Sequence, residues 1–451
     1  MGNISTSYKS TSASSSGGLS NLWNQEDSWA VWLGLTIVLL SIVFWGIGDN
    51  FMAWIGVKTP SYSNFQDPLN YLSSHKDSIF ALYLFFLILF SIAFKALNVK
   101  VKWFFAGFTF LFGLSVLVSV VGSWDVMKRY NIETPLLALV VGLLISNLLK
   151  IPNWLNTALQ TQFYVKLGIV LMGATLPFTL LLEAGSVAFS QATIIAVATF
   201  LSIYWTGTRL FSLDKRFAAT LAAGGSICGV SAAIAVGGAV KADKQHVSIA
   251  ISLVILCSII MIFILPFAIN VLNVLPGPAG AWIGTAEFAD APGMAAAAAI
   301  NEQALRTFTL MKVVGRDMFI GIWCFIMALV SITRWDKRYG SSKPNAKDIW
   351  LRFPKFVLGF FISSIIISIL TASNIGTPKV INANVINPII QLRDWSFIFT
   401  FLSIGLSSRF KELASAGWKP LAAITAGVFV NLPLGYLLSV KIMNNFWTIV
   451  K

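Results

Sequence analysis

Charged side chains are scarce in this sequence of 451 residues. Asp, Glu, Lys and Arg make up 11% of it, whereas soluble domains carry about 25% charged residues. Hydrophobic residues account for 57%, and the mean hydropathy is +0.78. This composition excludes a sizeable soluble domain. It predicts an all-α polytopic membrane protein whose long apolar helices cross the bilayer.

Histidine and cysteine are also scarce, which restricts the chemistry available to the chain. His75 and His246 are predicted to lie in separate loops, and Cys228, Cys257 and Cys324 fall inside apolar runs without the spacing of metal ligands. We therefore expect free thiols, no metal site and no cofactor. The sequence shows no pairing of a nucleophile with a base, so we do not expect an enzyme.

Acidic residues are outnumbered by basic ones, and the formal net charge is +14 at pH 7. In a soluble protein this excess would suggest a nucleic-acid partner, but here the Lys and Arg residues lie in short loops between apolar runs. There they orient the helices and contact anionic lipid, so we expect the lipid bilayer and no nucleic acid as a partner. The loops on the N-terminal side carry more Lys and Arg, which predicts a cytoplasmic N-terminus.

Composition divides the chain into three parts. Residues 1–28 are polar and Ser-rich, and are predicted to be a disordered tail that is not a cleaved signal peptide. Residues 29–122 are predicted to form an accessory N-terminal transmembrane bundle, and residues 123–451 a larger domain. The apolar runs are 29–47, 79–97, 102–122, 135–149, 163–182, 188–207, 216–240, 247–270, 280–300, 309–332, 353–372, 395–410 and 418–440.

A faint internal repeat relates the middle of the chain to its end. Gly173 and Gly185 have the same spacing as Gly405 and Gly417, and the apolar runs beside them align. An odd number of crossings separates the two copies, so they would have opposite orientations in the membrane. Inverted repeats are typical of secondary transporters. The alternative is a chance alignment in a sequence rich in Leu, Ala and Gly.

The apolar run 216–240 has an unusual middle. It contains Gly225, Ser226, Cys228, Gly229 and Ser231 close together, and both glycine and serine are poor residues for a helix interior. We therefore predict a helix break, which inside a membrane is tolerated only where it is buried in protein or lines a wet cavity. The N-terminus of the second half-helix would favour an anion. The alternative is a small-residue stripe that lets two helices pack closely.

The run 280–300 is predicted to contain a second break. Pro292 and Gly293 interrupt the helix pattern, and Glu287 and Asp290 lie just before them, three residues apart on one helical face. Acidic residues inside an apolar segment mark an ion or proton path by default. Alternatively, the segment begins later and Glu287 lies in an aqueous loop.

Two basic residues begin the next apolar run. Lys312 and Arg316 are four residues apart, so both are expected on the helical face that looks toward the two breaks, where they would provide counter-charge for an anion. Alternatively, they extend to the lipid headgroups, and Asp317 pairs back to one of them.

Five stretches together carry a family resemblance. Residues 225–233 read Gly-Ser-Ile-Cys-Gly-Val-Ser-Ala-Ala, and residues 166–173, 214–216, 312–316 and 401–406 accompany them. From about residue 130 to 440 the chain resembles the YeiH-like family of membrane proteins, which are described as sulfate exporters. The resemblance implies a secondary transporter of the bacterial inner membrane. Its fold would be similar to sodium/proton antiporters and bile-acid sodium symporters, with two broken helices that cross at mid-membrane.

The sequence thus predicts an inverted-repeat secondary transporter whose transport domain is 123–451. Its solute would be a small anion such as sulfate or an organosulfonate, coupled to protons or sodium; the alternatives are a cation/proton antiporter and a passive anion channel. The sequence does not decide whether the N-terminal bundle forms the contact of a homodimer. Asp290 and Glu287 are the expected ion-coupling residues. The expected substrate-binding residues are Gly225, Ser226, Cys228, Gly229, Ser231, Gly293, Lys312 and Arg316.

Overall fold

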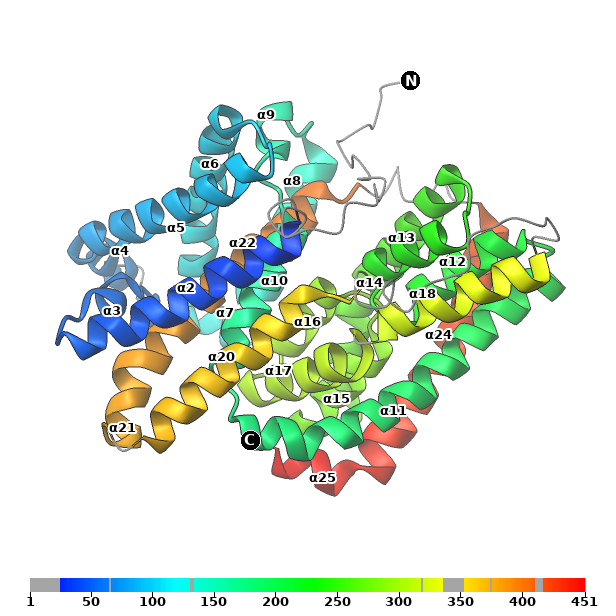
Figure 1. Ribbon diagram of the computed structural model, residues 1–451. Coiled ribbons are helices and arrows are strands. Elements are labelled where there is room, and N and C mark those ends of the chain that lie inside the picture. Colours follow the sequence, from blue (N-terminus) through cyan, green and yellow to red (C-terminus); the bar gives the residue numbers. More distant parts are fainter. Residues whose placement is uncertain are drawn as a thin grey trace.

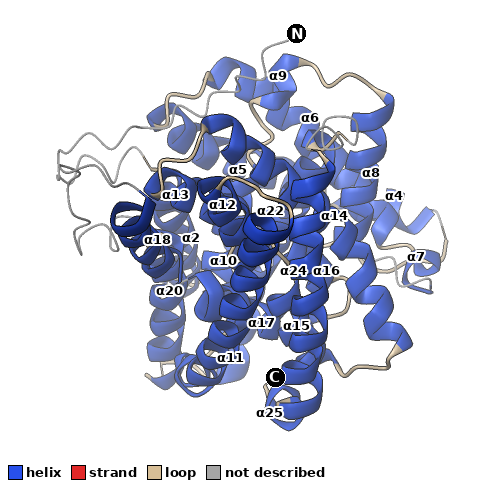
Figure 2. Ribbon diagram, turned by 90° about the vertical axis from the view of Figure 1, so that its right-hand side faces the viewer, coloured by secondary structure: helices blue, strands red, loops and turns tan. Residues whose placement is uncertain are grey.

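The computed structural model describes residues 25–64, 66–129, 134–317, 319–335, 353–373, 375–409 and 417–450. This described part of the chain is built almost entirely of helices joined by loops (Figure 2). Within it, nine helical stretches are long and apolar enough to cross a membrane, which confirms a polytopic membrane protein. They are Glu26–Gly46, Lys76–Ala96, Val101–Gly122, Phe178–Leu210, Lys244–Val271, Glu302–Trp335, Lys355–Ala372, Pro378–Ser407 and Trp418–Ile442.

The helices form two packed groups. The first, which we call the α10 group, has α10 at its centre, packed against α2, α20 and α22, while α8 packs along α22. Figure 1 shows α5 and α6 on the outer side of this group. Its helices are α2 (Glu26–Gly46), α5 (Lys76–Ala96), α6 (Val101–Gly122), α8 (Thr134–Leu148), α10 (Thr161–Gly173), α20 (Lys355–Ala372) and α22 (Asn387–Ser407).

Close backbone contact holds α8 against α22. A Cβ on Gly142 would lie 2.8 Å from the Leu402 carbonyl oxygen, and one on Gly405 would lie 2.5 Å from the Leu139 carbonyl oxygen. Only glycine allows the two helices to approach this closely, so the packing of α8 against α22 depends on glycine at both positions.

The second group, the broken-helix group, lies on the other side of the molecule in Figure 1. In it α11 packs against α12, α24 and the π-helical segment η2, and α15 packs against α17. Its elements are α11 (Phe178–Trp205), α12 (Lys215–Ser226), α13 (Val230–Ala239), α14 (Lys244–Val271), α15 (Pro276–Ala286), α16 (Asp290–Ala298), α17 (Glu302–Thr309), η2 (Leu310–Asp317), α18 (Phe319–Val330) and α24 (Trp418–Tyr436).

The remaining elements are short. They are α3 (Phe51–Ile55), α4 (Gln66–Ser74), α7 (Asp125–Arg129), α9 (Asn153–Asn156), η1 (Thr206–Leu210), η3 (Ser331–Trp335), α21 (Pro378–Ile381), η4 (Asn382–Ile386), η6 (Leu437–Ile442) and α25 (Asn444–Ile449). Contact between the two groups is concentrated at α16, which touches α8, α10 and α22. Helix α20 adds contacts to α11 and η2.

Several predicted boundaries are wrong. The run 163–182 is not one helix, because α10 ends at Gly173 and α11 begins at Phe178, directly after Pro177. The predicted run 395–410 begins too late, since α22 already starts at Asn387 with Pro388 in its first turn, where proline is well tolerated.

The N-terminal helix α2 begins at Glu26, inside the span predicted to be a tail, while residues 1–24 of that tail lie outside the described residues. The helix packs against α10 and α20. The division into an accessory bundle and a transport domain stays a prediction. So does the inverted repeat, whose second copy runs through residues 410–416, which are also outside the described part.

Candidate functional site

The first predicted helix break is present. Helix α12 ends at Ser226, Ile227 to Gly229 are not helical, and α13 starts at Val230. Gly229 has φ +70° and ψ −116°, a conformation that is costly for any residue with a side chain. The break therefore occurs where the glycine permits it.

The second break is also present, but its predicted position is wrong. Helix α15 ends at Ala286, and α16 starts at Asp290, so the interruption spans Glu287 to Ala289. The sequence placed it at Pro292. Proline lies instead in the first turn of α16, where its missing N–H has no helical partner to lose.

The two breaks touch each other. A Cβ on Gly229 would lie 3.0 Å from the Phe288 carbonyl oxygen and 3.1 Å from the Ala289 Cβ. Positive φ and close approach thus both require glycine at this point. The structure brings the two irregular segments together as the sequence predicts.

Replacing this glycine is expected to destabilise the fold. Gly229→Ala forces a side chain into a strained backbone conformation and against Phe288 and Ala289 of the second break, at a cost of about 1–3 kcal/mol. Thermal unfolding in detergent measures the effect. Gly238→Ala, in α13 with open space around its Cβ position, is the matched control and is expected to leave the melting temperature unchanged or raise it; equal melting of the two variants would contradict the argument.

Lys312 joins the two breaks. Its Nζ donates to the carbonyl oxygens of Ile227 at 3.0 Å, Glu287 at 3.0 Å and Phe288 at 3.1 Å, and it lies 3.8 Å from Asp290 Oδ1. The residue is fully buried. It therefore supplies hydrogen-bond donors to carbonyl groups that have lost their helical N–H partners at the two breaks.

Arg316 does the same for the end of α15. Its NH1 group donates to the carbonyl oxygens of Gly284, Thr285 and Glu287 at 3.1, 2.6 and 2.9 Å. The sequence predicted that Lys312 and Arg316 would look toward the breaks, and they do. Their role as counter-charge for an anion stays a prediction; in the structure these donors meet the carbonyl ends of the first half-helices, because the freed carbonyl groups need a partner.

Three carboxylates gather beside these cations. Glu287 and Asp317 are fully buried and Asp290 is 7% exposed. Within the described part of the chain, neither oxygen of Glu287 or Asp317 has a hydrogen-bond partner of ordinary geometry, and the same holds for Asp290 Oδ1. Such unpaired buried carboxylates are costly, which points to a functional role.

A cavity of about 260 Å³ opens at the breaks. Asp290 and Asp317 both line it, and so do Cys228 and Ser231 from the first break. Its full lining is Asp27, Cys228, Ser231, Ile234, Ala235, Asp290, Asp317, Ile320, Pro354 and Phe356. The cavity thus lies between α13, α16, η2 and α18 on one side and α2 and the start of α20 on the other.

Other predicted site residues do not line this cavity. The Ser226 hydroxyl is fully buried. Gly225 packs toward Ile203, and a Cβ on Gly293 would meet the Phe308 ring and, at 2.9 Å, the Glu287 Cγ atom. Gly225 and Gly293 therefore allow close packing around the breaks. The sequence missed Asp317 and Asp27 as cavity residues; for Asp317 the available signal was an acidic residue inside an apolar run.

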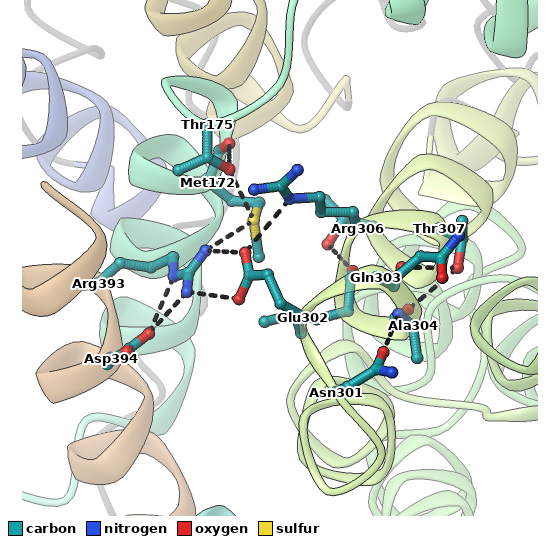
Figure 3. A network of polar contacts seen from close by, with 12 residues as sticks. Met172, Thr175, Asn301, Glu302, Gln303, Ala304, Arg306, Thr307, Arg393 and Asp394 are labelled. Carbon is teal, nitrogen blue, oxygen red and sulfur yellow. Dashed lines mark hydrogen bonds and ion pairs between the residues drawn. The ribbon is translucent and has the colours of Figure 1, made fainter. Parts of the chain in front are cut away.

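A second polar cluster joins the two helix groups (Figure 3). Arg393 of α22 binds the carboxylate of Glu302 of α17 at 2.8 and 2.9 Å, and also contacts Asp394 and the Met172 sulfur. Arg306 adds a longer contact to Glu302 at 3.4 Å. A two-pronged Arg–carboxylate pair with a 1% exposed Arg is a strong contact, and the sequence analysis did not find it.

The fold and the site together define a polytopic helical membrane protein in which two interrupted helices meet beside an acidic cavity. The family described as Conserved hypothetical protein 698 matches residues 106–424, and the chain belongs to this family. The YeiH-like family inferred from the sequence is the same family.

Relatives in several bacteria extend this similarity. A UPF0324 membrane protein of Rhodopirellula baltica is 33% identical over 371 residues, which cover 82% of this chain and 68% of that protein. One from Nitratidesulfovibrio vulgaris is 31% identical and is matched over 63% of its own length. One from Nitrosomonas europaea is 29% identical, with 92% of this chain and 95% of that protein covered. No solved structure shows a significant match.

Proposed function

We propose that the protein is a secondary transporter, with no enzymatic step, whose cavity at the helix breaks binds the solute and whose carboxylates bind the coupling cation. The observation that carries the proposal is the placement of Asp290 and Asp317 in one cavity with the ends of two broken helices. An interrupted helix in a membrane protein is either buried in protein or lines a cavity, and transporters place their binding sites at such interruptions.

The charges suggest why solute and cation would move together. The described hydrogen bonds of Lys312 and Arg316 go to carbonyl oxygens, while Asp27, Asp290 and Asp317 face the cavity. An anion is repelled by these carboxylates until protons or sodium ions neutralise them. Binding of the anion and of the cation therefore favour each other, and linkage makes the effect equal in both directions.

The solute we propose is a small anion such as sulfate or an organosulfonate. Ser231, in the first turn of α13, lines the cavity, and the N–H groups of a first helical turn have no partner within the helix. Hydroxyl and N–H donors at a helix N-terminus suit an oxyanion. Cys228 lies beside them in the same lining.

Access would alternate between the two sides by movement of the helix groups. The cavity has walls from both groups, and the Arg393–Glu302 pair also joins them. Met172, which touches Arg393, lies six residues beyond Lys166 on α10, which is about 9 Å by the helical rise. Along the axis of α10, the two groups are thus separated by the cavity near Lys166 and joined by the Arg393–Glu302 ion pair near Met172.

Flux measurements in proteoliposomes test the proposal. Radiolabelled sulfate uptake is expected to rise when an inward proton or sodium gradient is imposed, and to fall when unlabelled methanesulfonate competes. Sulfate flux that ignores both gradients would show a passive channel instead.

The carboxylates also favour a second candidate, a cation/proton antiporter. Three carboxylates in one cavity suit a cation better than an anion. This candidate predicts sodium-driven proton movement in liposomes that contain no sulfate or sulfonate. The anion transporter predicts no such movement under those conditions.

A further inference from the structure

The N-terminal helix contributes a carboxylate to the cavity. Asp27, in the first turn of α2, lines the cavity together with Asp290 and Asp317. It comes from a part of the chain that precedes the family match at residues 106–424. The neighbouring Glu26 does not belong to the lining.

Basic groups from the α10 group hold Asp27 in place. Lys166 of α10 lies 2.6 Å from Asp27 Oδ1 and 3.5 Å from Glu26 Oε1. Lys355, at the start of α20, is close enough to interact with Asp27 electrostatically. The Asp27 side chain is 27% exposed, so it can meet what enters the cavity.

Acidic groups of the other helix group face Asp27. Asp290 and Asp317 line the same cavity as Asp27 and interact with it electrostatically. Asp290 is balanced in part by Lys312 at 3.8 Å. Asp317 is fully buried, and neither of its oxygens has a hydrogen-bond partner among the described residues. Carboxylates thus face one another across the cavity, Asp27 offset in part by Lys166 and Asp290 in part by Lys312. Burial of Asp290 and Asp317 limits the screening of the charge that is left.

We infer that Asp27 is a third carboxylate of the coupling-cation site, and that cation uptake between α2 and the broken-helix group allows the cavity to close. This inference rests on the proposed function. Without the cation, repulsion between Asp27 and the carboxylates on α16 and η2 holds the walls apart. With protons or sodium ions bound, the repulsion is removed and the closed arrangement is populated.

A distance measurement that needs no knowledge of the solute tests this. Spin labels are placed on exposed positions of each group, at Leu39→Cys on α2 and Phe429→Cys on α24, in a background with Cys257 and Cys324 replaced. Cys228, which lines the cavity and is buried, is kept. Pulsed electron spectroscopy gives the distance distribution at high pH, at low pH, and at high pH with sodium. Acid or sodium is expected to shift the ratio of closed to open populations by on the order of tenfold in the parent.

Variants of the first turn of α2 separate Asp27 from its surroundings. Asp27→Asn is expected to be largely closed without the cation, so its remaining shift falls below about twofold. Asp27→Glu keeps the carboxylate and restores the shift. Glu26→Gln, which also removes a charge beside Lys166, is the matched control and responds like the parent.

The outcomes distinguish this inference from the proposed function. A parent-like shift in Asp27→Asn overturns the role of Asp27 and leaves the transporter proposal intact. A parent that responds to neither acid nor sodium overturns cation coupling itself, and the role of Asp27 with it. The acid and sodium arms show which cation acts.

Discussion

Asp317→Asn is expected to reduce gradient-driven sulfate uptake in proteoliposomes at least about tenfold. Asparagine keeps the size of the side chain but can neither take up a proton nor attract a cation. Asp317 is fully buried, lines the cavity and has no hydrogen-bond partner in the described structure, so no hydrogen bond is lost when its charge is removed, although Arg316 and Lys312 lose part of their counter-charge. Its loss is therefore expected to affect coupling more than folding.

Asp290→Asn is expected to act in the same direction. Asp290 is the first residue of α16 and lies 3.8 Å from Lys312, so this variant also leaves a buried cation with less counter-charge. Asp67→Asn, on an exposed turn of α4, is the control. Both cavity variants should elute as folded protein in detergent; if they also kept the parent's response to a proton or sodium gradient, these carboxylates would have no part in coupling.

Lys312→Met is expected to cause the largest loss of stability of any substitution at the site. The buried carbonyl groups of Ile227 and Phe288 lose the donor that Lys312 provides, and the Glu287 carbonyl keeps only its contact with Arg316. Asp290 loses its nearest cation. Removing one partner from a buried charged contact typically costs about 3–5 kcal/mol. Methionine keeps a similar volume, so a packing defect does not explain the loss.

Thermal unfolding in detergent checks this result. Lys102→Met, which removes an exposed lysine near the start of α6, is expected to melt like the parent. Lys312→Arg keeps a charged donor and should recover part of the stability. If Lys312→Met melted at the parent's temperature, the crossing of the helices would not depend on this contact.

The sequence predicted the first break well because its cause is local. Gly229 must adopt a positive φ, and glycines and serines beside it weaken the helix. The second break was misplaced because Pro292 can equally begin a helix. Which of these roles the proline takes depends on what packs around it.

The site could be predicted only in part. The spacing of Lys312 and Arg316 placed them on one face, and that face does look toward the breaks. Spacing does not reveal whether such cations bind an anion or cap carbonyl groups. To distinguish these two roles, one must know where the C-terminal ends of α12 and α15 lie relative to Lys312 and Arg316.

Long-range partners were beyond the reach of sequence patterns. Asp27 and Lys166 are 2.6 Å apart but belong to different helices, and the same is true of Arg393 and Glu302. Each looks like an ordinary charged residue near the end or middle of an apolar run. Only the packing of α2 and α22 against their neighbours shows which charges meet.

The central claim is that anion binding and cation binding at the helix breaks are linked, and reversing the driving force tests it most directly. Proteoliposomes with a pH-sensitive dye inside are given an inward sulfate gradient, with no imposed proton or sodium gradient. We predict that sulfate entry carries protons inward and acidifies the lumen, or accumulates sodium when sodium is the coupling ion, and that Asp317→Asn abolishes this movement. Sulfate entry with no accompanying proton or sodium movement would contradict the account.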